Sequence, residues 1–551
     1  MLSAAVLGLS AAFAWWYAPI WRANNAIKIA RQWLDAGKQE RAAEAVRHAL
    51  IVAPRRVEAW QLAADFAAQT GQRQAALEYR RQAAKLSPSD AALAIDWAAA
   101  ALEGNELNEA DTALQTLSQE QRGRSARAER LTGEIFRRRG ELAAAREHFE
   151  AALRVGGAKA ENEIPLGMVL LAEQDAATRA RGVALLERWQ SDPHWGAEAL
   201  RRLLADAVLR KETDAIVKSA SALIVHPARE RSDTLNCLLS FGEVRPEKFS
   251  PALADVEQAW AKDPAAVSDL VGWLSGTKRG AEALRWTKTL PREITTVPPV
   301  SVTLADTLRV LGDWPALRNW TEAGDWKEVD FLRRAYLALA ERESGNLARA
   351  DELWRGLRSM AELDGGHGLF LAGTLYSWGN TAEAVELWWL ASNQPGVAVP
   401  ALGSLARYFQ LRRDADGLYR VFRRLYEVRS DDPRVANNFA YLSALTGHGL
   451  PEAQRIARGV YEKQPDDPAF CSTYIFVLHR SGADQNAVAL LPKIFAAAES
   501  NPSIAFTCAV VAAETGRKED ARKFLAKVDE QALTLQEAAL LKSARAAAEK
   551  L

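Results

Sequence analysis

The chain has 551 residues, of which 48% are hydrophobic and 25% charged, a composition typical of folded globular proteins that excludes wholesale disorder. Its 70 basic and 70 acidic residues balance, which argues against a dedicated nucleic-acid-binding protein, because such proteins carry a basic excess. Three cysteines cannot form a disulfide framework, and no C-x-x-C pair indicates zinc or redox chemistry.

The first 21 residues carry no charged side chain, and a helix needs about this length to cross a hydrocarbon core of roughly 30 Å. Four aromatic residues near the end of this stretch are typical of a membrane-surface belt: Trp15, Trp16, Tyr17 and Trp21. We therefore expect residues 1–22 to be a transmembrane anchor or a signal segment. Ala12-Phe13-Ala14 fits a signal-peptide cleavage site, although the usual basic segment before it is missing. A buried first helix is the third interpretation.

The charges around this stretch predict the side of a membrane on which the rest of the chain would lie. Arg22, Lys28 and Arg31 follow the stretch, and only the α-amino group precedes it. The positive-inside rule favours the cytoplasm, whereas a basic segment upstream of the first residue would place the chain in the periplasm. We expect a single-pass protein of the cell inner membrane.

An internal period of 34 residues runs along the remainder of the chain. Small, aromatic and turn residues recur at this spacing near both ends: Gly37 and Gly71; Pro54 and Pro88; Ala42, Ala76 and Ala110; Gly345 and Gly379; Trp354 and Trp388; Ala453, Ala487 and Ala521. Fixed periods of about 20–50 residues indicate repeat architectures, in which neighbouring units stack to bury their apolar faces.

Residues 57–90 show the physical logic of one unit. Apolar residues at helical spacing predict a helix over Val57–Gln69, and Gly71 ends it, as a glycine after a helix does. A second helix is predicted over Gln74–Leu86, and Pro88 stops it because proline cannot continue a helix. The unit is therefore a helical hairpin.

This unit resembles the tetratricopeptide repeat (TPR) family. The family pattern places a large apolar residue at position 4, small residues at 8 and 20, an aromatic at 24, alanine at 27 and proline at 32. Here those positions hold Trp60, Ala64, Ala76, Arg80, Ala83 and Pro88, so position 24 departs from the pattern. Residues 434–467 also resemble the family, with Tyr441 in place of a small residue. The resemblance implies an all-α fold, a right-handed solenoid of helical hairpins with about 15 repeat-sized units, some degenerate.

The pattern divides the chain into five segments. After residues 1–22 we expect an N-terminal TPR array over 23–159 and degenerate TPR-like hairpins over 160–330, where the period fades. A C-terminal TPR array is expected over 331–535. Residues 536–551 resemble a solvated capping helix, which the end of an array requires, and we expect Ala548 to lie in its frayed end.

No sequence motif for catalysis, metal binding or a cofactor is present. G-x-x-x-x-G-K-[ST], H-E-x-x-H and G-x-S-x-G are all missing, and the seven histidines are far apart. Cys471 and Cys508 are expected to pack as small buried hydrophobes. We therefore predict a protein that is not an enzyme and holds no metal or cofactor. Three tryptophans of the irregular segment 301–330 could cover a repeat junction or form a surface patch: Trp314, Trp320 and Trp326.

The resemblance also implies which residues would bind a partner. In TPR proteins the first helix of each unit lines a concave surface, mainly through positions 2, 5, 9 and 12. In the C-terminal half we assign this role to Arg342, Tyr376, Gln410, Arg413, Asn438, Ser472, Phe476, His479 and Phe506. Arginine can hold a carboxylate, asparagine can bond a peptide backbone, and aromatic rings provide anchors, so a protein or peptide partner is expected.

These observations lead to a hypothesis for function: a membrane-tethered, non-catalytic scaffold that binds a protein or peptide partner through the TPR concave surface. The Ala- and Arg-rich helices suggest a bacterial protein, and the resemblance suggests envelope or polysaccharide assembly as the process. Two alternatives stay open. One is an accessory subunit or hidden enzymatic module in residues 160–330. The other is a glycan-binding solenoid whose exposed tryptophans stack on sugars.

Overall fold

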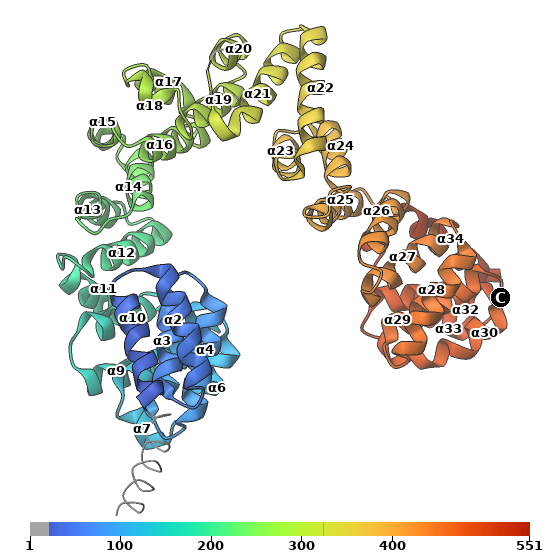
Figure 1. Ribbon diagram of the computed structural model, residues 1–551, viewed down its shortest axis with the longest axis horizontal. Coiled ribbons are helices and arrows are strands. Elements are labelled where there is room, and N and C mark those ends of the chain that lie inside the picture. Colours follow the sequence, from blue (N-terminus) through green and yellow to red (C-terminus); the bar gives the residue numbers. More distant parts are fainter. Residues whose placement is uncertain (1–20, 323, 551) are drawn as a thin grey trace, which may run out of the picture. The chain divides into compact units, whose positions relative to one another are not determined.

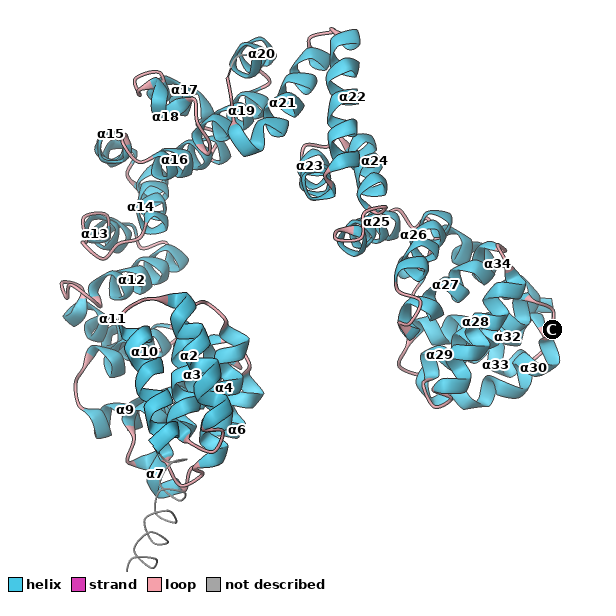
Figure 2. Cartoon of the chain, viewed as in Figure 1, coloured by secondary structure: helices cyan, strands magenta, loops and turns pink. Residues whose placement is uncertain are grey.

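The computed structural model describes residues 21–550 except residue 323, and contacts divide the chain into two compact units, Met1–Trp260 (unit 1) and Ala261–Leu551 (unit 2). Within the described residues every regular element is an α-helix or a short 3₁₀-helix, and no strand occurs (Figure 1, Figure 2). Within each unit, consecutive helices pack as antiparallel hairpins, and neighbouring hairpins pack on one another. The predicted all-α fold of stacked helical hairpins is confirmed, whereas the count of about 15 repeats stays a prediction.

Unit 1 begins with helical residues 21–35 and continues with fourteen further helices. They are α2 (Gln39–Val52), α3 (Val57–Gln69), α4 (Arg73–Leu86), α5 (Ala91–Glu103), α6 (Leu107–Gln115), α7 (Gln119–Gly123), α8 (Ala126–Arg138), α9 (Leu142–Gly156), α10 (Ala160–Leu171), α11 (Ala176–Trp189), α12 (Gly196–Arg210), α13 (Thr213–Leu223), α14 (Arg231–Val244) and α15 (Pro246–Trp260).

Unit 2 contains the remaining helices of the described chain. They are α16 (Pro264–Gly276), α17 (Gly280–Thr287), α18 (Arg292–Thr295), α19 (Val300–Leu311), α20 (Trp314–Glu322), η1 (Lys327–Val329), α21 (Asp330–Glu343), α22 (Leu347–Leu363), α23 (Gly365–Ser377), α24 (Thr381–Ala391), α25 (Ala398–Leu411), α26 (Ala415–Val428), α27 (Pro433–Thr446), α28 (Leu450–Lys463), α29 (Pro468–Arg480), α30 (Asp484–Leu490), η2 (Leu491–Ile494), α31 (Phe495–Ala498), α32 (Pro502–Glu514), α33 (Lys518–Leu525), η3 (Glu530–Ala532) and α34 (Leu535–Lys550).

The hairpin α3–α4 shows how the sequence produces one unit. The first helix has the predicted bounds, Val57–Gln69, and the second begins at Arg73, one residue before the prediction. Gly71 has a φ of +73°, a left-handed conformation that side chains disfavour, and this residue reverses the chain. Ala63 and Ala76 are buried, because small side chains let the two helices approach closely.

Several first helices begin with an acid or amide residue followed by proline. Asp432, Asp467 and Asn501 each precede a proline, and each side chain accepts hydrogen bonds from the next two free amides. These side chains satisfy amide groups that have no partner within the helix, and proline fits the first helical position because its missing N–H would have been unpaired there.

Tryptophan side chains fill the seams between helices while their ring N–H groups find acceptors. Trp97 donates to Glu109 at 2.9 Å, and Trp189 donates to the buried carboxylate of Glu163 at 2.7 Å. Trp388 is 5% exposed. Trp97 and Trp189 thus combine packing with a satisfied polar end, and Trp388 packs in the core.

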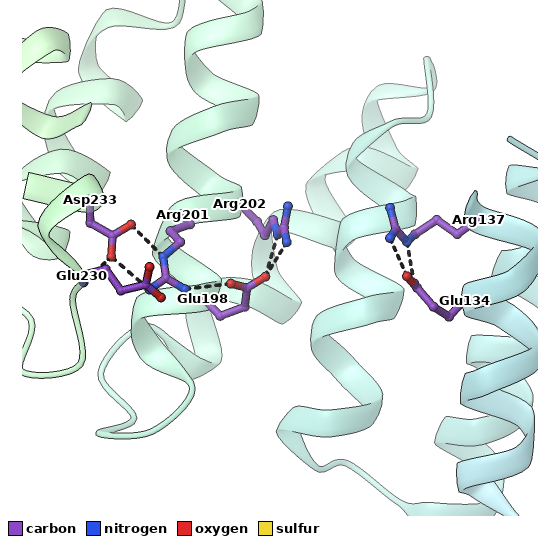
Figure 3. A network of polar contacts seen from close by, with 7 residues as sticks. All are labelled: Glu134, Arg137, Glu198, Arg201, Arg202, Glu230 and Asp233. Atoms are coloured by element: carbon purple, nitrogen blue, oxygen red, sulfur yellow. Dashed lines mark hydrogen bonds and ion pairs between the residues drawn. The ribbon is translucent and has the colours of Figure 1, made fainter. Parts of the chain in front are cut away.

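An arginine joins two successive first helices of unit 1. Arg201 of α12 makes a two-pronged contact with Asp233 of α14, Nε to Oδ1 at 2.7 Å and Nη2 to Oδ2 at 3.0 Å (Figure 3). Asp233 is 3% exposed and also accepts the main-chain amide of Glu230 at 2.7 Å. The bond to Asp233 raises the pKa of Arg201 above its usual value. Because both partners are held from two sides, this pair fixes the stacking of α12 on α14.

Three further ion pairs in Figure 3 stay within single helices. Glu198 accepts bonds from Arg201 and Arg202 along α12, and Arg137 makes a two-pronged contact with Glu134 along α8, with both bonds at 2.7 Å. Burial alone would raise the pKa of Glu134, but the bonds from Arg137 and Arg138 lower it below its usual value. These pairs support individual helices and not the contact between hairpins.

Residues 160–330 form helical hairpins that continue the pattern of their neighbours. Here α10 packs on α11, α12 on α13, α14 on α15, α16 on α17 and α19 on α20. The segment after the phase break at 295–300 contains α20, a short second helix. Trp326 is buried at 1% exposure, whereas Trp314 and Trp320 are half-buried, and Trp320 donates its ring N–H to the carbonyl of Ser301 at 3.1 Å. The buried ring of Trp326 covers a junction and offers no face to a sugar.

The last helix, α34, is not a solvated cap along its whole surface. Leu541, Ala544 and Ala548 are buried, at 2%, 0% and 5% exposure, because one face of α34 packs on α32, α33 and α27. The expectation that Ala548 lies in a frayed end is therefore wrong. The five-segment division of the chain otherwise stays a prediction.

The prediction of a single-pass inner-membrane protein is corrected by the structure. Within residues 21–550, residue 323 aside, no helix has both the length and the apolar character of a membrane span. A span requires about 20 apolar residues, whereas α22, the longest helix whose bounds are given above, has 17 residues and carries several charges. Residues 1–20, on which the anchor and signal-segment predictions rested, lie outside the described part of the chain.

Candidate functional site

The nine residues predicted to line a partner-binding surface all belong to unit 2. Eight lie on the first helices of six successive hairpins (α21, α23, α25, α27, α29 and α32), and Arg413 lies in the turn after α25. We call the surface formed by these helices and this turn the first-helix face. The structure divides the nine residues into three groups: exposed, already paired with other side chains, and buried.

Two of the exposed residues belong to one patch. Tyr376 of α23 is 40% exposed, and its ring meets the ring of Tyr408 of α25 edge-on, with centroids 6.3 Å apart. The guanidinium of Arg412 lies over the Tyr408 ring at 4.9 Å, and Gln410 is exposed beside it in the sequence. We call Tyr376, Tyr408, Gln410 and Arg412 the tyrosine patch.

The polar groups of the tyrosine patch are free to bind a ligand. Within the described residues, the two phenols, the Gln410 amide group and the Arg412 guanidinium form no hydrogen bond or ion pair with other side chains or the main chain. Below them, the ring of Trp388 supports Tyr376 with centroids 5.2 Å apart, and Trp388 itself is buried. The patch therefore combines supported aromatic rings with unused donors and acceptors, a combination that is typical of binding hot spots.

Asn438 of α27 is the third exposed residue, but it is isolated from the patch in the sequence and has no aromatic ring contact of its own. Its neighbour Asn437 is buried, and the Asn437 side-chain oxygen has no hydrogen-bond partner within the described residues. The Asn438 side chain is exposed, and its role in binding a partner stays a prediction.

Arg342 and His479 are occupied by internal partners. Arg342 of α21 pairs with Glu383 of α24 at 2.5 Å, and so joins two hairpins. His479 of α29 lies between two carboxylates, with Nδ1 2.7 Å from Asp484 and Nε2 3.0 Å from Glu514. Burial acts to lower the pKa of His479, but the bonds to Glu514 and Asp484 outweigh it and raise the pKa above its usual value. Both residues hold the array together in this structure.

Ser472, Phe476 and Phe506 are buried, at 6%, 0% and 1% exposure. Phe476 and Phe506 belong to the same apolar cluster as Leu541, Ala544 and Ala548 of α34. The positions of Phe476 and Phe506 on first helices were predicted, but the packing of α34 into their cluster was not. In this structure the three side chains present no surface to a partner.

Arg413 binds a segment of its own chain. Its Nη2 donates to the carbonyl of Glu530 at 3.1 Å, its Nε donates to the carbonyl of Leu533, and its own carbonyl accepts the amide of Leu535 at 2.9 Å. Arg413 was predicted to help hold a peptide partner, and in this structure its side chain binds the main-chain carbonyls of Glu530 and Leu533.

Sequence reasoning missed Tyr408, Arg412 and Tyr441. Tyr408 and Arg412 fall outside the four positions that the family pattern assigns to the concave surface, so no positional rule pointed to them. Tyr441 was visible as a departure from the pattern, because a large polar ring stood where a small residue was expected. Its phenol donates a hydrogen bond to Glu537 of α34. A departure of this kind is a signal for an additional contact.

All three cysteines are free and buried, and burial raises the pKa of the Cys237 and Cys508 thiols to about 12, so they stay protonated and unreactive at neutral pH. Cys471 and Cys508 belong to one apolar cluster, as expected of packing residues. Within the described residues, no group of three or more His, Cys, Asp or Glu side chains is arranged to hold a metal ion.

No family model and no curated protein sequence matches the chain. Among solved structures, the chain is similar to Pseudomonas aeruginosa PilF, with 19% identity over 42% of this chain and 99% of that chain and a TM-score of 0.32. It is also similar to a chain of the APC/C hetero-tetramer Cut9–Hcn1 (12% identity, 84% and 99% coverage, TM-score 0.28). A third similarity is to a chain of Naa15/Naa10 bound to HypK-THB (12% identity, 96% and 97% coverage, TM-score 0.29). At such low identities and TM-scores these similarities carry no argument about activity or partner.

Proposed function

We propose that the chain is a non-catalytic scaffold that binds a segment of a partner protein on the first-helix face of unit 2. The observation that carries this proposal is the tyrosine patch. Its two rings and one amide come from two successive first helices, and its guanidinium comes from Arg412, directly after the second of these helices. The polar groups of the patch have no partner within the described residues. An extended or helical peptide would stack on the rings, while Gln410 and Arg412 would bond its main chain or a carboxylate.

The two rings of the tyrosine patch are held in place by neighbouring side chains, which favours a role in binding a partner. Tyr376 rests on the buried ring of Trp388, and Tyr408 is held between Phe409 and Arg412, with the Tyr408 and Phe409 centroids 5.0 Å apart. A side chain that is already fixed loses little conformational freedom when a ligand binds, so more of the contact energy appears as affinity.

The test begins with a random peptide library displayed on phage and selected on the full chain. The affinity of each selected peptide is then measured by fluorescence anisotropy for the unaltered chain and for Tyr376→Ala, Gln410→Ala and Leu363→Ala. Leu363 is the matched control, because it is 88% exposed but lies at the end of α22, a second helix. We expect Tyr376→Ala to weaken binding by about tenfold or more and Leu363→Ala to leave it unchanged. Peptides that bind all variants equally would contradict the proposal.

A further inference from the structure

The end of the chain folds back onto its own first-helix face. Residues 530–535 are held by the turn between α25 and α26, and α34 then packs on α27, α32 and α33 of the same unit (Figure 1). The contact joins segments 120 positions apart in the sequence, far beyond the 34-residue spacing between neighbouring hairpins.

The contact at the start of α34 is made by specific polar groups. Besides the three bonds of Arg413 to residues 530–535, Gln536 donates to Asp416 at 2.9 Å and accepts the main-chain amide of Ala415 at 3.4 Å. The turn between α25 and α26 therefore holds a main-chain segment and one amide side chain, much as a binding site holds a peptide.

Glu537 connects the first turn of α34 to the first-helix face. One of its carboxylate oxygens accepts the amide and the hydroxyl of Thr534, at 2.7 and 2.8 Å, and the amide of Glu537 donates to the Thr534 hydroxyl at 3.2 Å. This reciprocal arrangement caps the helix. The other oxygen accepts the phenol of Tyr441 on α27. A single carboxylate thus starts the helix and fixes its position on the array.

The apolar face of α34 follows directly after this carboxylate. Leu541, Ala544 and Ala548 come four, seven and eleven positions after Glu537, a spacing that places them on one side of a helix. They belong to the same buried cluster as Phe476 and Phe506, while the other side of α34 is exposed. Leu533, just before α34, is buried in the same cluster, and Ala538, Leu540 and Ala547 pack against it partly buried. The apolar contact of α34 is therefore made mainly by alanine and leucine side chains, and each methylene-sized group that it buries is worth roughly 0.8 kcal/mol.

The connection to α34 also differs from the other turns of this region. Residues 526–534 connect α33 to α34 and contain only the short 3₁₀-helix η3, whereas residues 515–517 suffice to connect α32 to α33. The longer connection lets residues 530–535 reach the α25–α26 turn, while α34 itself packs on α32 and α33. Its site there is continuous with the tyrosine patch, because Arg412 of the patch directly precedes Arg413.

We infer that α34 is an internal occupant of a binding surface, and that the partner which displaces it is an amphipathic helix of the same pattern. That pattern is a carboxylate in the first turn, an aliphatic side chain four positions later, and small residues seven and eleven positions after the carboxylate. The inference rests on the proposed function in treating the first-helix face as a binding surface. When α34 leaves, Tyr441 loses its carboxylate partner, and the cluster that contains Phe476 and Phe506 loses the apolar cover of Leu541, Ala544 and Ala548. An apolar surface uncovered in this way favours a partner.

The test uses the full chain and a fluorescent synthetic peptide of residues 529–550. In Leu541→Asp, a charge opposes the docking of α34 and leaves its site free. This variant should bind the peptide about tenfold or more tightly than the unaltered chain does. In the unaltered chain, the tethered α34 competes with the peptide at an effective concentration of about millimolar. A peptide carrying Glu537→Gln should bind Leu541→Asp about fivefold or more weakly, since the bond to Tyr441 loses its charged acceptor. Equal binding of the first peptide to both chains, or no binding to a folded Leu541→Asp, overturns the inference.

Hydrogen exchange of the unaltered chain gives a second test that does not depend on how any variant folds. We expect the amides of 538–549 to exchange at least about tenfold faster than those of α27 and α32, through an opening that leaves the array folded. Exchange of α34 only together with α32 overturns the inference, because α34 would then be an inseparable part of the stack. A concentration-dependent dimer of Leu541→Asp in sedimentation would identify a second copy as the occupant and would also overturn it.

The two proposals fail separately. A peptide that needs only the tyrosine patch should bind Leu541→Asp and the unaltered chain equally, because the patch lies on α23, on α25 and on the residue that follows α25. Loss of 529–550 binding with retained binding to the patch would refute the inference and leave the proposed function standing.

Discussion

Tyr441 of α27 donates its phenolic O–H to Glu537 in the first turn of α34, 96 positions further along the chain. The bond ties the last helix to a hairpin three repeats earlier. Burial, and then the nearby Glu537 carboxylate, raise the pKa of Tyr441 well above its usual value of about 10. The contact thus depends on the phenol staying protonated.

Tyr441→Phe should therefore loosen α34. We expect a loss of about 1–2 kcal/mol in the free energy of opening of α34 at pH 7, measured by hydrogen exchange, because a hydrogen bond to a charged acceptor is lost. Tyr474→Phe is the control, because the phenol of Tyr474 forms no hydrogen bond within the described residues. An equal effect of both changes would show that ring burial matters and the bond does not.

The same residue predicts a dependence of stability on alkaline pH. A group whose pKa is higher in the folded than in the unfolded state stabilises the fold below its unfolded pKa, here about 10, and the contribution is lost as the pH rises through the folded value. The melting temperature of the unaltered chain should fall above pH 10 more steeply than that of Tyr441→Phe. Parallel curves for the two proteins would refute this assignment.

His479 predicts a second pH dependence near neutrality. Its pKa is raised in the fold and that of Glu514 is lowered, mainly by their mutual bond. The contribution of His479 to folding stability is complete below about pH 6.5 and is lost as the pH rises through its raised folded pKa. The contribution of Glu514 is lost as the pH falls through its lowered folded pKa. His479→Gln should thus cost about 1–2 kcal/mol near pH 6 and less near pH 9, in denaturant titrations. His194 is exposed and belongs to unit 1, so His194→Gln should leave the free energy of unfolding unchanged at both pH values.

Overpacking at the small residues between helices should be costly. Ala384 and Ala487 are fully buried, and replacing either by leucine should cost about 1–3 kcal/mol, measured as the shift of the denaturation midpoint. Because α34 is packed, Ala548→Leu should also destabilise, which reverses the expectation from sequence. Ala539, exposed on the other side of α34, is the matched site, and Ala539→Leu should stay within about 0.5 kcal/mol. Similar shifts at Ala548 and Ala539 would show that α34 is not docked in solution.

Removal of Arg201 should destabilise unit 1. Arg201→Ala leaves the Asp233 carboxylate buried with only a main-chain donor, and the loss of one partner of such a pair typically costs about 3–5 kcal/mol. Arg202→Ala removes an exposed pair with Glu198 and should cost less than about 1 kcal/mol. The comparison is made by thermal unfolding, and equal losses for the two variants would contradict the structural role of the pair.

Local sequence patterns by themselves determined the hairpins of this protein. The bounds of α3 and the burial of Ala384 and Ala487 were predictable, because helix periodicity, glycine turns and the 34-residue period describe contacts within a hairpin and with its neighbour. The Tyr376 and Gln410 positions were found by the same rule and are exposed, as a binding role requires.

Only the tertiary structure decided which of the predicted surface residues are accessible. Phe476 and Phe506 occupy the predicted positions yet are buried, and Arg413 holds residues 530–533 of its own chain. The physical reason is the return of α34 across 120 positions, a contact that depends on where the stacked hairpins bring the α25–α26 turn in space. A repeating pattern specifies what each unit presents to its neighbour, but the covering of one surface by a distant helix depends on how all the intervening units stack.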